Sequence, residues 1–207
     1  MPDVATHTPD SDVDTASEPV RQRRFTREEY VRMAETGVLG PEDRTELIDG
    51  YLIEMTAQNA PHRAAIVNGT KLFVDLLRNT RYSVQVQSTL PLDCRNVPEP
   101  DFAIFRGDGS DLLDGEPDEV PLIVEVSDTT LTYDRTTKLV CYASNDIPEY
   151  WIVNLQTQTL ECYRNPAADE YRERRTLERE ATVAPRFEDA LELAVSDLLL
   201  TQSEEEE

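Results

Sequence analysis

Two carboxylates and a lysine lie in or beside apolar segments within residues 99–138. Asp101 follows Pro100 and directly precedes the apolar run 102–105, and Glu125 lies inside the apolar run 122–126. Lys138 follows in a stretch with the residue pattern of a helix. Carboxylates and a lysine that converge on one point are the groups that a divalent-metal phosphodiesterase site requires. We therefore take residues 99–138 as the candidate site.

The two apolar runs are rich in β-branched and aromatic residues, which is typical of central strands covered on both faces. Pro100 favours an extended backbone at the entry to the first strand. A buried carboxylate such as Glu125 is costly unless it is paired, protonated or bound to a metal. If the two strands are neighbours, Asp101 and Glu125 can share a Mg²⁺ or Mn²⁺ ion, because Mg²⁺ takes one or two carboxylates plus waters and phosphate oxygens.

Lys138 has two readings from the sequence. We expect a helix over residues 134–144 with Asp134 at its N-cap or first turn, and this spacing places Asp134 and Lys138 on one helical face. Only Lys71 and Lys138 are lysines among the 20 basic residues, so a lysine retained here is a candidate to position an attacking water. The alternative is a solvated helix charge paired with Asp134.

A third acid, Glu46, lies in a predicted β-hairpin. Residues 45–48 and 51–55 have strand character and are joined by Asp49-Gly50, a strong two-residue turn signal. Alternation of side chains allows Glu46 to point at the site, and an exposed strand acid fits the pattern equally well.

Four further polar residues are candidates for accessory roles: His62, Gln87, Ser127 and Asp134. His62 lies near the start of a helix that we expect to continue to residue 78, where it could contact a phosphate or hold a site carboxylate, or be a plain surface histidine. Residues 82–90 alternate with period two and predict a strand. Its Gln87 could hydrogen-bond a substrate or a neighbouring acid.

The remaining pattern predicts one domain over residues 23–202, with acidic tails at 1–22 and 203–207. Thr26 and Glu29 form a capping-box signature that predicts a helix over 27–35. Residues 147–153 predict another core strand and 170–175 an edge strand. The three cysteines show no metal-site spacing and are expected to be reduced thiols.

The net charge of −22 is the feature hardest to reconcile with a nucleic-acid substrate. Nine of the acids lie in the first 20 and last four residues, so the rest of the chain stays strongly acidic. General attraction to a polyanion is not expected. A lysine-poor, arginine-rich, acidic composition favours a halophilic host, where salt screens the repulsion. The other reading is that nucleic acid is not the ligand.

The order of these motifs resembles the Uma-two family of the restriction-endonuclease-like PD-(D/E)XK superfamily. The resemblance covers about residues 25–200. It rests on 46–50 (Glu-Leu-Ile-Asp-Gly), His62, 99–101 (Glu-Pro-Asp), 123–127 (Ile-Val-Glu-Val-Ser), 134–138, 142–143 (Tyr-Ala) and 147–153 (Ile-Pro-Glu-Tyr-Trp-Ile-Val).

The resemblance implies an α/β (α+β) fold with a central mixed β-sheet flanked by helices, and a metal-dependent nuclease site. Asp101 and Glu125 would bind the metal and Glu46 would be an extra acid. The lysine that the superfamily places two residues after the second acid is replaced by Ser127, and Lys138 would serve instead.

The sequence therefore predicts a Mg²⁺-dependent endonuclease acting on nucleic acid, with DNA favoured over RNA. The alternative is an inactive nuclease-like module that acts through protein contacts. No apolar run is long enough to span a bilayer. We expect a cytoplasmic protein, with a homodimer as one expected assembly.

Overall fold

The computed structural model describes residues 22–40 and 42–199. The predicted acidic tails, up to residue 21 at one end and 203–207 at the other, lie outside the described residues, so the predicted domain limits stay predictions. Within the described part of the chain, no helix is long and apolar enough to cross a membrane.

The chain folds around a six-stranded sheet with strand order β3-β4-β5-β6-β7-β8. The pair β5–β6 is parallel and all other neighbours are antiparallel, which confirms the predicted mixed sheet. The edge position of β8 is also as predicted. The strands are β3 (Tyr82–Val86), β4 (Phe102–Arg106), β5 (Leu122–Ser127), β6 (Glu149–Asn154), β7 (Thr159–Ala167) and β8 (Glu170–Glu178).

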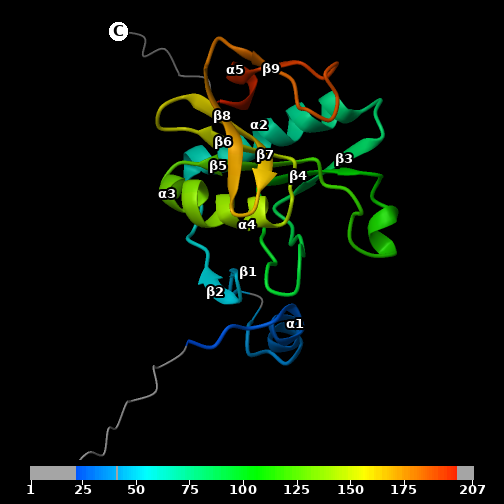
Figure 1. Cartoon of the computed structure of the whole chain (residues 1–207), viewed down its shortest axis with the longest axis vertical. Coiled ribbons are helices and arrows are strands. Elements are labelled where there is room, and N and C mark those ends of the chain that lie inside the picture. Colours follow the sequence, from blue (N-terminus) through cyan, green and yellow to red (C-terminus); the bar gives the residue numbers. More distant parts are fainter. Residues whose placement is uncertain (1–21, 41, 200–207) are drawn as a thin grey trace, which may run out of the picture.

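Helices cover both faces of this sheet (Figure 1). One face packs against α2 (Ala60–Leu77) and α5 (Val195–Leu198), together with the small pair β9 (Thr182–Val183) and β10 (Leu193–Ala194). The other face packs against α4 (Leu139–Ser144). Because strand side chains alternate, Val124 and Val126 face α2, whereas Ile123 faces α4.

Alternation therefore sends Glu125 of β5 toward the face that α4 covers. The helical segment before α4 is continuous with it and consists of α3 (Leu131–Tyr133) and the π-helix η2 (Asp134–Lys138). The predicted helix start at Asp134 is wrong, because the chain is already helical from Leu131 and Thr130 is the N-cap residue. Single π turns inside α-helices are rare and often lie at functional sites.

The N-terminal elements lie at one end of the molecule, away from the six-stranded sheet (Figure 1). Helix α1 (Arg27–Glu35) begins with the predicted capping box. Strands β1 (Thr45–Ile48) and β2 (Tyr51–Glu54) form the predicted hairpin. Leu47 of β1 also pairs with Val97 in the segment that leads into β4, which brings the hairpin to the start of that strand.

One predicted strand differs in length from the structure. Strand β3 ends at Val86, earlier than the predicted end at residue 90, because Gln87 has a positive φ of 47° that leaves the strand conformation. The acidic loop between β4 and β5 contains one short 3-10 helix, η1 (Asp111–Leu113).

Candidate active site

The structure brings Asp101 and Glu125 together at the end of two neighbouring strands. Phe102 of β4 pairs with Val124 of β5, and one step further along this register places Asp101 opposite Glu125. The backbone N–H of Asp101 donates to Glu125 Oε2 at 3.2 Å. Both side chains are buried, Asp101 to 7% and Glu125 to 5% exposure. The antiparallel pairing of β4 and β5 thus brings together two acids that are far apart in the sequence.

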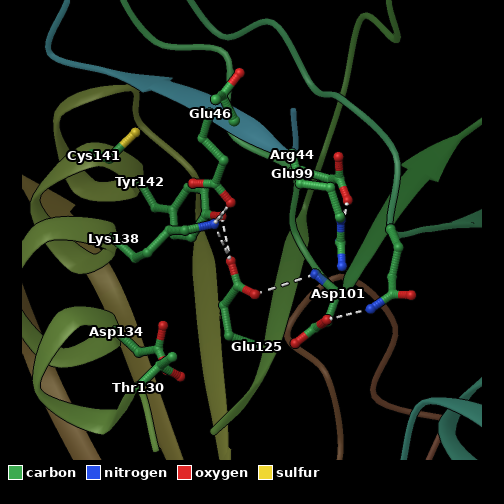
Figure 2. Close-up of polar contacts among 12 residues, drawn as sticks. Arg44, Glu46, Glu99, Asp101, Glu125, Thr130, Asp134, Lys138, Cys141 and Tyr142 are labelled. Atoms are coloured by element: carbon green, nitrogen blue, oxygen red, sulfur yellow. Dashed lines mark hydrogen bonds and ion pairs between the residues drawn. The ribbon is translucent and has the colours of Figure 1, made fainter. Parts of the chain in front are cut away.

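Lys138 lies between Glu125 and Glu46 (Figure 2). Its Nζ donates to Glu46 Oε1 at 2.7 Å and to Glu125 Oε1 at 3.0 Å, and the residue is only 3% exposed. The reading of Lys138 as a solvated charge paired with Asp134 is therefore wrong. The exposed-strand reading of Glu46 is also wrong, because Glu46 is 2% exposed. A buried ammonium group needs carboxylate partners, and β1 and β5 supply them.

Asp101 is held by three protein groups from separate elements. His62 Nε2 lies 3.1 Å from Asp101 Oδ2, and Gln87 Nε2 donates to Asp101 Oδ1 at 3.0 Å. The backbone N–H of Val126 donates to Oδ2 at 2.8 Å. His62 occupies the first turn of α2, and the positive φ of Gln87 places this residue just beyond the end of β3. His62 and Gln87 thus both orient a site carboxylate, one of the options that the sequence allowed.

Asp134 and Ser127 lie in the same region, and Lys138 and Asp101 both act on the charge of Asp134. Among the described residues, no side-chain hydrogen bond or ion pair joins Asp134 or Ser127 to Lys138 or Asp101. Asp134 Oδ2 accepts a hydrogen bond from Thr130 Oγ1 at 2.7 Å. Burial raises the pKa of Asp134 to about 6, although the hydrogen bond from Thr130 opposes the shift. Ser127 is fully buried at the end of β5.

A pocket of about 600 Å³ lies over the site, and its lining includes Glu46, His62, Asp101, Glu125, Asp134 and Lys138. The segments that line it are the hairpin β1–β2, the start of α2, the strand ends 99–101 and 125–126, and residues 128–138. Among the described residues that line it, Lys138 is the one lysine or arginine, beside seven acids: Glu46, Glu54, Glu99, Asp101, Glu125, Asp128 and Asp134. A pocket this acidic favours a cation over a free anion.

Burial and charge both act on the ionisation of the central groups. Burial raises the pKa of Glu125 above its ordinary value, with Lys138 opposing the shift and Asp101 adding to it. Burial also raises the pKa of Glu46, again against Lys138. For Lys138, burial lowers the pKa, but Glu125 and Glu46 together outweigh it and raise the pKa above 10.5. Lys138 therefore stays an ammonium group at neutral pH.

The donor set fits a hard divalent ion in its chemistry. Asp101 and Glu125 offer carboxylate oxygens, and Glu46 Oε2 is buried with no hydrogen-bond partner among the described residues. Among the described residues, no group of three or more His, Cys, Asp or Glu side chains is arranged to hold a metal ion by itself. Mg²⁺ does not require such a cage, because it is usually bound by one or two carboxylates plus waters and substrate oxygens.

Sequence reasoning missed the part played by two tyrosines. Tyr142 donates its hydroxyl to Glu125 Oε1 at 2.6 Å and is fully buried. Its place four residues after Lys138 was the available signal, because i and i+4 side chains share a helix face. Tyr133, at the end of α3, lines the pocket. No pattern in the sequence around Asp134 indicated this position.

A mixed sheet covered by helices on both faces, with acids meeting at the ends of two central strands, is the restriction-endonuclease-like fold. The chain belongs to the Uma2 (Uma-two) family, described as "Putative restriction endonuclease", whose model matches residues 27–196.

A solved structure described as a "putative nuclease belonging to DUF820 from Anabaena variabilis" has the same fold. It is 17% identical to this chain, with a TM-score of 0.64, and the match covers 84% of this chain and 97% of that one. At this identity the likeness supports the fold alone. No curated protein matches this chain.

Proposed function

We propose that this protein is a metal-dependent endonuclease that hydrolyses phosphodiester bonds in nucleic acid, with DNA favoured over RNA. The observation that carries the proposal is the buried contact of Glu125 with both Lys138 and the backbone of Asp101, in a pocket that all three residues line. Membership of a family described as restriction endonucleases supports the same reaction class.

Asp101 and Glu125 would hold the metal, with the unpaired oxygen of Glu46 as a further ligand or acceptor. A bound Mg²⁺ or Mn²⁺ supplies a water of lowered pKa and neutralises charge on the phosphate. The chain's own residues keep the site ordered, since His62 and Gln87 fix the Asp101 carboxylate. Tyr142 fixes Glu125.

Lys138 contributes a fixed positive charge. Its ammonium group stays protonated between two carboxylates, so it can orient a water molecule or stabilise charge that develops on the phosphate. An arginine would not replace it readily, because a guanidinium is larger and has a fixed planar geometry.

The proposal is tested by removing the negative charge of the two proposed metal ligands while keeping the size of their side chains. Asp101→Asn and Glu125→Gln should each lower cleavage of a plasmid or labelled duplex with Mg²⁺ by at least about a hundredfold. Asp75→Asn removes an exposed acid that pairs with Arg78 and serves as the control. Full activity in both site variants would exclude this site.

One observation favours the alternative of a catalytically inactive module. Every carboxylate oxygen of Asp101 and Glu125 already accepts a hydrogen bond from the protein, so a metal must compete with these donors. Titration calorimetry with Mg²⁺ and Mn²⁺ separates the two functions, because the inactive module predicts no binding heat in wild type. The cytoplasmic location, the homodimer and the halophilic host stay predictions.

A further inference from the structure

The hydroxyl of Tyr133 is a buried polar group without a partner. It has no hydrogen bond to any described residue, yet it is shielded from solvent. An unsatisfied buried hydroxyl is costly, and native proteins rarely keep one without a reason. Tyr133 also lines the pocket that holds Glu125 and Lys138.

A second unpaired atom lies in the same pocket. Glu46 Oε2 is buried without a partner, although Glu46 Oε1 accepts from Lys138. His62 Nδ1 is buried without a partner as well, so three residues that line this pocket each have an unpaired polar atom. This indicates that something other than protein completes these hydrogen bonds. Tyr133 supplies a donor there, and Glu46 supplies an acceptor.

The electrostatic surroundings keep Tyr133 a donor. Burial raises its pKa above the ordinary value, and the nearby charges of Glu46 and Glu125 raise it further, against the opposing effect of Lys138. The hydroxyl is therefore protonated at neutral pH and can donate a hydrogen bond.

We propose that the Tyr133 side chain turns toward the pocket when substrate binds and donates a hydrogen bond from its hydroxyl to a non-bridging oxygen of the scissile phosphodiester. This inference rests on the proposed endonuclease function and extends it to a substrate-binding residue. The acidic composition of the pocket supports it, since Lys138 is the one lysine or arginine among the described residues of the lining and two carboxylates already bind it. A neutral hydroxyl meets an anionic oxygen without first breaking an ion pair.

The test compares wild type with Tyr133→Phe, which removes one oxygen atom and no other group. The probe is a short duplex with a single stereodefined phosphorothioate at the cleaved position, beside the all-oxygen duplex, both with Mg²⁺. Loss of a hydrogen bond to a charged oxygen should lower kcat/KM for the all-oxygen duplex roughly ten- to hundredfold. Because sulfur accepts hydrogen bonds poorly, one phosphorothioate isomer should slow wild type and have a smaller effect on the variant.

Thermal unfolding separates this role from a structural one. Removing an unpaired buried hydroxyl should leave the Tm unchanged or raise it. Tyr171→Phe is the matched control, because the Tyr171 hydroxyl donates to the carbonyl of Ile147 at 2.9 Å and does not line the pocket. This control should lower the Tm and leave kcat/KM unchanged.

Each outcome decides between the two proposals. Unchanged kcat/KM in Tyr133→Phe, or an equal phosphorothioate effect in both proteins, would overturn the Tyr133 inference and leave the endonuclease intact. A lower Tm with unchanged kcat/KM would assign the hydroxyl to a structural water, which also overturns it. If wild type neither binds nor cleaves either duplex, single-stranded DNA or RNA, the proposed function fails and takes this inference with it.

Discussion

At the residue scale, the buried ammonium group of Lys138 stabilises two acids that could not otherwise share one site. Glu46 and Glu125 both contact its Nζ, and all three side chains are nearly solvent-free. Buried ion pairs contribute little net stability relative to apolar residues, but removing one partner strands the other charge. The contacts of Lys138 that organise the site should therefore also make the fold sensitive to substitution of this residue.

Lys138→Met should therefore destabilise the fold by about 3–5 kcal/mol, since it leaves two carboxylates buried without a cation. Urea unfolding at neutral pH measures this loss. Lys71→Met, at the other lysine and on the exposed face of α2, should change stability by less than about 0.5 kcal/mol. Equal stability of the two variants would mean that protonation of Glu46 and Glu125 compensates fully for the lost cation.

Asp134 gives stability a pH dependence of definite sign. Its pKa is about 6 in the folded protein, against an ordinary value of 3.8. Between these values the folded state retains a proton that the unfolded chain has lost, so stability falls as pH rises and then levels off above about pH 6. Below about pH 3.8 the contribution is fully present.

The measurement is the unfolding free energy of wild type relative to Asp134→Asn, which cannot titrate. From about pH 4 to about pH 7 this difference should fall by up to about 3 kcal/mol, at about 1.4 kcal/mol per pKa unit. A flat difference, or one that rises with pH, would contradict a raised pKa at Asp134.

At the element scale, close packing of α2 on β4 fixes the position of His62 relative to Asp101. A Cβ at Gly69 of α2 would lie 2.6 Å from Cζ of Phe102, the residue that follows Asp101. Phe102 in turn packs on Phe73, with ring centroids 5.2 Å apart. The ring has little room to move, so any side chain at Gly69 pushes α2 away from the strand.

Gly69→Ala should cost about 1–3 kcal/mol through overpacking, despite the better helix propensity of alanine. It should also reduce cleavage, because it displaces His62 from Asp101. Gly109→Ala is the control, since no heavy atom lies within 4 Å of a Cβ there. Wild-type stability in Gly69→Ala, measured by urea unfolding, would show that the Phe102 ring shifts freely.

At the scale of the whole molecule, the net charge of −22 determines how the protein meets a nucleic acid. The surface repels a polyanion at low salt, and the Debye length shrinks from about 10 Å at 0.1 M to about 3 Å at 1 M salt. A protein that grips DNA through many lysines and arginines loses affinity steeply over this range. For this protein, added salt instead weakens the repulsion between the acidic surface and the nucleic acid.

Cleavage should therefore be retained or should increase between about 0.1 M and about 1 M KCl at fixed Mg²⁺, because screening removes repulsion and the described pocket lining has one lysine and no arginine. The initial rate on a labelled duplex measures this, with the Asp101→Asn variant as the blank. A fall of about a thousandfold or more would indicate a cationic DNA-binding surface instead.

Local patterns in the sequence were sufficient for most of the elements. The capping box at Thr26, the Asp49-Gly50 turn and the continuous apolar run of β5 each depend on neighbouring residues, and each predicted its element correctly. The helix start at Asp134 was predicted wrongly, because a π turn depends on what the helix packs against. The family resemblance supplied the fold class, which periodicity alone does not specify.

For the candidate site too, part could be predicted from the sequence and part depended on the tertiary structure. The sequence by itself determined which residue types were present: two acids at apolar strands, a rare lysine and a histidine at a helix start. Only the tertiary structure decided that Lys138 turns inward to Glu46 and Glu125 and that Tyr133 has no partner. The physical reason is that burial and long-range contacts set the partner of a charged or polar group, and neither is encoded in local spacing.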